Sequence, residues 1–126
     1  MFRTDPSLSI AGTSLIREVM LAPAFLVQRF GPPGPSDPYK CTGSYTFTAM
    51  NRTGGDGDGP FTVYEYKSTT AYHGEDADVP TPEAFWRSRD EHRFSIGGRA
   101  EEDDGSADVF IQWLLSKYER WRRTDG

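Results

Sequence analysis

The sequence is poor in cysteine: Cys41 is the only one among 126 residues. An internal disulfide is therefore impossible, and a zinc site built mainly on thiolates is excluded. A chain of this kind suits a reducing compartment, and we expect a cytoplasmic location.

Long hydrophobic runs are also lacking. The most apolar stretch, LIREVMLAPAFLVQRF at 15–30, is interrupted by Arg17, Glu18 and Pro23. A membrane-spanning helix needs about 20 mostly apolar residues, and a signal peptide needs an uninterrupted apolar run behind a basic start. We therefore expect no membrane segment, and we interpret this stretch as a core-facing part of a soluble domain.

A surplus of positive charge is missing as well, since the formal net charge is −5. This charge argues against a protein that binds nucleic acids or anionic membranes nonspecifically. The expected order of one helix, three strands and a last helix is similar to that of double-stranded RNA-binding domains. Those domains hold phosphates with a basic cluster at the start of the last helix, where this chain has EEDDGSAD at 101–108. We therefore predict no nucleic-acid partner.

The stretch RFSIGGR at 93–99 raises the question of an anion-binding turn. A phosphate-binding loop would read GxxxxGK followed by Ser or Thr, or GxGxxG, and would lead directly into a helix. Here Gly97, Gly98 and Arg99 are followed by the acidic run EEDD, which would repel an anion. We predict a bend or bulge that ends a strand, with Arg99 neutralising its acidic neighbours; an anion site at Arg99 is the alternative.

Metal-binding patterns are incomplete. The DGDG run at 56–59 suggests a calcium loop, but the fifth and twelfth positions of such a loop hold Pro60 and Lys67 instead of oxygen ligands. His73 lies among acidic residues at a spacing that matches no ligand template, so a solvated loop is the better interpretation. We expect no metal and no cofactor.

The elements expected from the periodicity of apolar residues and from capping signals form a short series. In chain order they are a helix from Leu15 to Phe30 with a kink at Pro23 and a cap at Gly31, strands at 39–49 and 61–72, a short helix after Thr81, a strand at 92–98, and a long helix from Ser106. The glycine-rich run at 51–59 is expected to be a flexible hairpin loop, and residues 1–12 are expected to be mobile.

The last helix carries the clearest helical pattern. Apolar residues recur at helical spacing, namely Phe110, Ile111, Leu114, Leu115, Tyr118 and Trp121. Acidic residues precede this helix, and Lys117, Arg120, Arg122 and Arg123 close it, an arrangement that favours the helix dipole. The pattern predicts a single α+β domain over 1–126. In it, a small antiparallel sheet of three or slightly more strands is packed on one face by the C-terminal helix and an N-terminal helical segment.

The faces of the second strand are harder to assign. Burying Glu65 and Lys67 would cost far more than burying tyrosines, so the tyrosine side is predicted to face the helix. This choice leaves Phe61 and Val63 on the outer face as an apolar patch. Either the N-terminal segment or a second copy of the chain would cover the patch, and we favour a homodimer.

Nothing in these patterns indicates a catalytic centre. We expect a non-enzymatic interaction or self-associating module whose partner is a second copy or an unidentified protein. The alternative is a small-molecule-binding protein or enzyme with a cleft near Tyr64, Tyr66, His92 and Arg93.

Overall fold

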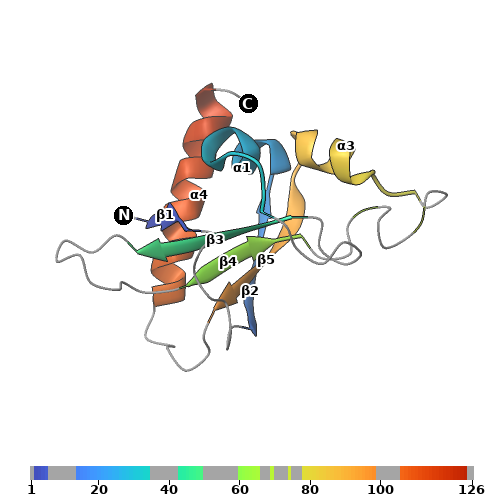
Figure 1. Cartoon of the computed structure of the whole chain (residues 1–126). Helices are drawn as coiled ribbons and strands as arrows, with labels where there is room; N and C mark the ends of the chain where they lie inside the picture. The colour runs from blue at the N-terminus through green and yellow to red at the C-terminus, as the bar shows by residue number, and fades with distance from the viewer. Residues whose placement is uncertain are drawn as a thin grey trace.

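A five-stranded antiparallel sheet covered by a long helix forms the centre of the molecule (Figure 1). The computed structural model describes residues 2–5, 14–34, 43–49, 60–65, 69, 74, 78–98 and 106–124. The elements in chain order are β1 (Phe2–Thr4), β2 (Ser14–Leu21), α1 (Pro23–Phe30), β3 (Ser44–Ala49), β4 (Phe61–Tyr64), α3 (Pro82–Arg87), β5 (His92–Gly98) and α4 (Ser106–Thr124). The strand order is β1-β3-β4-β5-β2. The α+β class is confirmed, and β1 and β2 extend the sheet beyond the three predicted strands.

The helix predicted from Leu15 to Phe30 is wrong in its first half. Residues 14–21 form the edge strand β2, and the helix begins only at Pro23, which occupies its first turn. Proline is favourable at the start of a helix because its missing N–H is not needed there. Val19 and Leu21 are buried while Glu18 and Met20 are exposed, the alternation of a half-buried strand. Pairing with β5 therefore prevails over the helical spacing of the apolar residues.

The first described residues of the chain form an edge strand that was not predicted. Residues 2–4 pair with β3, and Phe2 is buried, with its ring centroid 5.2 Å from that of Phe110 on α4. The mobility expected for 1–12 stays a prediction, because the pairing of β1 does not measure it. Residues 6–12, Cys41 and the hairpin loop predicted at 51–59 lie outside the described residues.

The two glycines of RFSIGGR lie within β5, which ends at Gly98. The irregularity is in the partner strand: Leu15 pairs with Gly97 and Arg17 pairs with Ile96, so Ile16 is an extra residue. A Cβ atom at Gly98 would lie 2.6 Å from Cδ1 of Ile16. The glycine thus leaves room for the bulged residue to pack against the core, and the bulge is in β2 and not at the end of β5.

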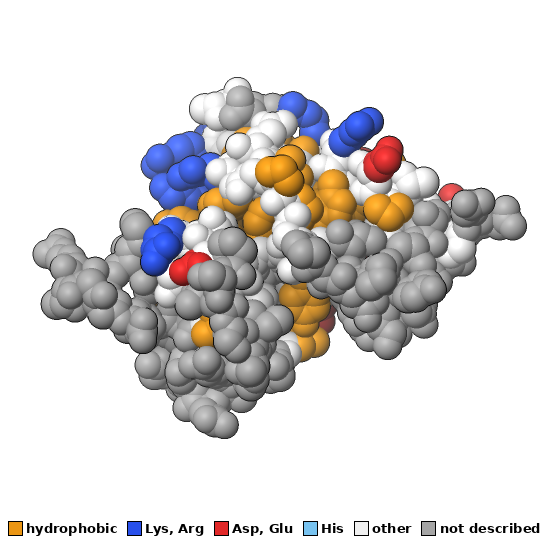
Figure 2. Space-filling view, viewed as in Figure 1, with side chains coloured by type: hydrophobic (Ala, Val, Ile, Leu, Met, Phe, Trp, Pro, Cys, Tyr) orange, Lys and Arg blue, Asp and Glu red, His pale blue; other side chains and the backbone are white. Residues whose placement is uncertain are grey.

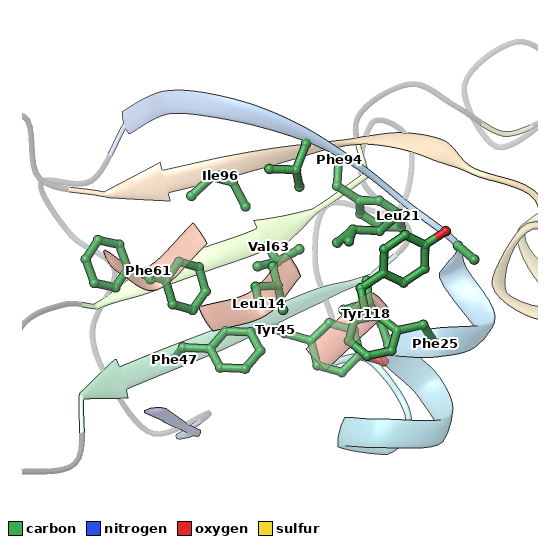
Figure 3. Packing of buried hydrophobic residues seen from close by; sticks show 14 of the residues in the cluster. Leu21, Phe25, Tyr45, Phe47, Phe61, Val63, Phe94, Ile96, Leu114 and Tyr118 are labelled. Atoms are coloured by element: carbon green, nitrogen blue, oxygen red, sulfur yellow. The ribbon is translucent and has the colours of Figure 1, made fainter. Parts of the chain in front are cut away.

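The face assignment predicted for the second strand is wrong. Phe61 and Val63 face α4 and are buried, with 3% and 0% of their surface exposed. Their register partners on β3 are Phe47 and Tyr45, and these side chains share the helix-covered face, where Figure 3 shows them beside side chains of α4. The interface predicted at Phe61 and Val63 is therefore part of the core of a single chain.

The physical reason for this error is Glu65. The prediction kept this carboxylate out of the core, but Glu65 is fully buried. Burial of a polar group is costly when its hydrogen bonds are unmade. Among the described residues, every buried side-chain nitrogen or oxygen atom has a hydrogen-bond partner. A satisfied carboxylate can therefore share a face with Val63.

The core is rich in aromatic contacts between α4 and the sheet. The ring of Phe61 stacks on that of Phe110, with centroids 4.8 Å apart and planes inclined by 5°. At the other end of the sheet, the Tyr45 hydroxyl donates a 2.6 Å hydrogen bond to the Gly31 carbonyl, just beyond the end of α1. Gly31 has a φ of 87°, which suits glycine at a helix end. These contacts fix α1 and α4 on the same side of the sheet.

The helix face can be tested with two adjacent leucines. Leu114 is fully buried under the sheet, whereas Leu115 is 37% exposed. Leu114→Ala is expected to lower the free energy of unfolding by about 2–5 kcal/mol because it leaves a cavity. Leu115→Ala, with the same change in helix propensity, is expected to lower it by less than about 1 kcal/mol. Urea denaturation followed by circular dichroism measures both, and equal losses would contradict the assigned face.

Candidate functional site

The residues of the predicted cleft do not meet on one face of the sheet. Arg93 and Tyr64 lie on the face away from α4, where Arg93 Nε is 3.1 Å from Glu18 Oε2 on β2. His92 is the neighbour of Arg93 in β5 and is paired with Leu21, so it points to the opposite face. Tyr66 and Arg99 lie outside the described residues. A cleft shared by His92, Arg93 and Tyr64 is therefore not formed.

His92 instead contacts a serine that the sequence analysis did not single out. Ser88 Oγ lies 3.2 Å from His92 Nε2, and the Phe85 ring centroid lies 4.9 Å from that of the imidazole. Ser88 Oγ also accepts a 3.1 Å hydrogen bond from the backbone N–H of Asp90, and the Ser88 carbonyl accepts one from Ala24. A serine next to a histidine suggests a nucleophile and its base. Here both residues fix the turn from α3 to β5, and we assign them a structural role.

Cationic side chains lie on the last turns of α4 and on two segments that pack beside Trp121, namely α1 and the connection from α3 to β5. We call this surface the cationic end. Its members are Arg29 in the last turn of α1, Arg89 in the connection from α3 to β5, and Lys117, Arg120, Arg122 and Arg123 on α4. Figure 2 shows Lys and Arg side chains gathered toward the upper part of the molecule, the part that holds the C-terminal end of α4 in Figure 1. The cationic end is conspicuous in a chain whose net charge is −5.

Aromatic rings underlie two of these guanidinium groups. The Arg89 guanidinium lies over the Trp121 ring, 5.6 Å from its centroid, and the Arg122 guanidinium lies over Tyr118 at 5.7 Å. Both rings are buried and nearly parallel, with centroids 6.0 Å apart. Cation–π contacts of this kind contribute about 0.5–1 kcal/mol at exposed sites. They also hold the charged groups at defined positions on the surface.

The rings are themselves anchored to neighbouring elements. Trp121 Nε1 donates a 2.9 Å hydrogen bond to Gln28 Oε1 on α1. Tyr118 is hydrogen-bonded to the Glu91 carboxylate. Burial raises the pKa of Tyr118 above its usual value, and the negative charge of Glu91 and this hydrogen bond raise it further. The phenol is therefore neutral at physiological pH and serves as a fixed support for Arg122.

An open hollow of about 350 Å³ lies next to this support and is lined by Glu119, Arg122 and Arg123. Among the described residues, no carboxylate forms an ion pair with Arg120, Arg122 or Arg123; the ion pairs join Arg3 to Asp5, Arg17 to Asp108 and Arg93 to Glu18. Two guanidinium groups beside a hollow can accept a carboxylate or another planar anion through paired hydrogen bonds.

The sequence analysis assigned the α4 cations to the helix dipole and did not recognise a surface. The segment KYERWRR at 117–123 does signal one, because arginines alternate with the two aromatic residues that support them. Arg29 and Arg89 gave no such signal, since only the fold brings α1 and the α3–β5 connection to the end of α4.

Other kinds of site find no support in the described ranges. These residues contain no group of three or more His, Cys, Asp or Glu side chains that could hold a metal ion. No helix among them is long and apolar enough to cross a membrane. Comparison with protein-family models and with curated proteins found no match to this chain.

The raised pKa of Tyr118, whose ring lies beneath Arg122, predicts a pH dependence of stability that can be measured. A phenol whose pKa is raised by folding stabilises the native state fully below pH about 10, and this contribution is lost as the pH rises through the raised pKa. We expect the urea midpoint of the wild type to fall between pH 9 and pH 11, and the midpoint of Tyr118→Phe to fall less, because the variant has no ionisable group at this position. Denaturation followed by circular dichroism at both pH values measures this. The same fall in both proteins would contradict the assigned environment.

Proposed function

We propose that the protein is a non-enzymatic interaction module that binds an acidic segment of a partner protein at the cationic end. The observation that carries this proposal is the pair of guanidinium groups of Arg122 and Arg123 beside an open hollow, without ion-paired carboxylates among the described residues. An acidic segment supplies the carboxylates that these groups lack.

The helix dipoles of α1 and α4 balance only part of the positive charge of the cationic end. The C-terminal end of a helix carries about half a negative charge, so the ends of α1 and α4 together offset about one cation. The cationic end holds six cations, more than the two helix ends offset. The guanidinium groups of Arg122 and Arg123, which form no ion pair among the described residues, are therefore not needed to balance the helix ends, and this supports a binding role.

The charge of the remaining chain favours a protein segment over a polyanion. The whole chain has a net charge of −5, so its other surfaces carry an excess of carboxylates. A nucleic acid or an anionic membrane extends beyond the cationic end and would meet these surfaces. A short acidic segment contacts the cationic end alone, because charges more than about 8–10 Å away are largely screened at physiological salt.

The proposal is tested with a fluorescently labelled oligoglutamate peptide and fluorescence anisotropy at low salt. The double substitution R122Q/R123Q is expected to weaken binding at least tenfold, because it removes both guanidinium groups beside the hollow. The matched control is R17Q/R93Q, which makes the same change in charge at exposed arginines on β2 and β5. We expect the control to bind within about threefold of the wild type.

Two results would overturn the proposed function. The first is a wild-type protein that does not bind the peptide at low salt. The second is an equal loss in the two double variants, which would show that net charge alone governs the interaction. Thermal melting of both variants verifies that each is folded under the conditions of the assay.

A further inference from the structure

We infer that the hollow at the cationic end selects carboxylate groups over phosphate groups, and that Glu119 determines this selectivity. The inference rests on the proposed function and names the chemical class of the anion that binds. It also gives a role to Glu119, the acidic side chain among the described residues that line the hollow.

Glu119 faces the same space as the two arginines of the hollow. Residues three and four positions apart are neighbours on one side of a helix, so the carboxylate of Glu119 lies beside Arg122 and Arg123 in the last turns of α4. All three side chains are exposed. Within the described ranges Glu119 forms no ion pair, and neither do the two arginines. An anion that binds the guanidinium groups is therefore placed close to a negative charge that no ion pair neutralises.

Arg122 is held in place by the ring beneath it. Its guanidinium group lies 5.7 Å from the ring centroid of Tyr118, which is buried and hydrogen-bonded to Glu91. A guanidinium group that covers a ring keeps its N–H groups at its edge, where they can donate to an anion. Arg122 cannot move away from Glu119 without losing the contact with the ring, so the hollow keeps donors and an acceptor side by side.

The charge of the hollow matches a carboxylate better than a phosphate. Two guanidinium groups and one carboxylate line it, which leaves one positive charge for a ligand to neutralise. A carboxylate carries one negative charge, whereas a phosphorylated residue carries about 1.5 to 2 at pH 7. The repulsion by Glu119 grows in proportion to the charge of the ligand, so it disfavours phosphate about twice as strongly.

The numbers of donors and acceptors favour the same choice. A carboxylate has two oxygen atoms, and two guanidinium groups can donate to both. A phosphate group has a third oxygen atom, and the remaining described side chain of the hollow cannot donate to it, because an ionised Glu119 is an acceptor only. The hollow therefore satisfies a carboxylate fully and a phosphate only in part.

Two peptides of equal length and nearly equal charge test this selectivity. One is oligoglutamate, and in the other phosphoserine alternates with serine, so that each phosphoserine takes the place of two glutamates. Fluorescence anisotropy at low salt measures the dissociation constant of each peptide. We expect the wild type to bind oligoglutamate at least about fivefold more tightly than the phosphoserine peptide, and E119Q to bind the two peptides within about twofold of each other.

Two further variants serve as controls. Glu119→Asp keeps the negative charge at this position and is expected to keep the preference for oligoglutamate. Glu83→Gln makes the same change in charge as E119Q at an exposed residue in the first turn of α3 that does not line the hollow, and it is expected to leave the preference unchanged. Thermal melting verifies that all variants are folded.

A wild type without a preference, or a preference that is the same in E119Q, overturns the inference. Equal strengthening of both peptides by E119Q also overturns it, because Glu119 would then only compete with the ligand for the arginines. If oligoglutamate binding still depends on Arg122 and Arg123, the proposed function stands in each of these cases. If oligoglutamate does not bind the wild type, both proposals fail.

Discussion

The packing of α4 against the sheet is the interaction on which the other features of the structure depend. Phe110 and Leu114 cover the strands, and the stacked pair of Phe61 and Phe110 fixes the register between helix and sheet. The same helix continues to Tyr118 and Trp121, which contact Phe25 on α1 with centroid distances of 5.2 and 5.9 Å. The apolar side of α4 therefore packs against the sheet and also positions the rings of Tyr118 and Trp121 beneath the cationic end.

Much of the fold could be predicted from the sequence where the local signal and the tertiary environment agree. Thr81 caps α3 as expected, accepting a 3.2 Å hydrogen bond from the Ala84 N–H, and Phe94 and Ile96 on β5 are fully buried. The long C-terminal helix is present with its apolar stripe toward the sheet. In these elements periodicity, capping and burial all favour the same structure.

The predictions were wrong where contacts between distant segments determine which local structure forms. The stretch 14–21 has helical spacing of apolar residues, but it lies beside β5, and strand pairing satisfies its backbone groups. Glu65 was assigned to solvent because its buried environment cannot be known from the sequence, and this one residue inverted the predicted faces of β4.

The cleft that combined His92 with Arg93 was a different kind of error. Adjacent residues of a strand point to opposite faces, so the predicted strand at 92–98 already argued against that cleft.

At the cationic end, the residues that pack in the core differ from those that carry the proposed binding. Tyr118 and Trp121 are buried, so truncating either would remove core contacts together with the support of a guanidinium group. Arg122 and Arg123 are exposed at the end of the helix, where the loss of a charge affects the dipole and one cation–π contact by only about 1–2 kcal/mol in total. An anion held by two guanidinium groups loses far more when both are replaced, because its charge-assisted hydrogen bonds depend on them directly. Replacing both arginines is therefore expected to remove the proposed binding while the fold is retained, because the aromatic rings lie inside and the arginines lie outside.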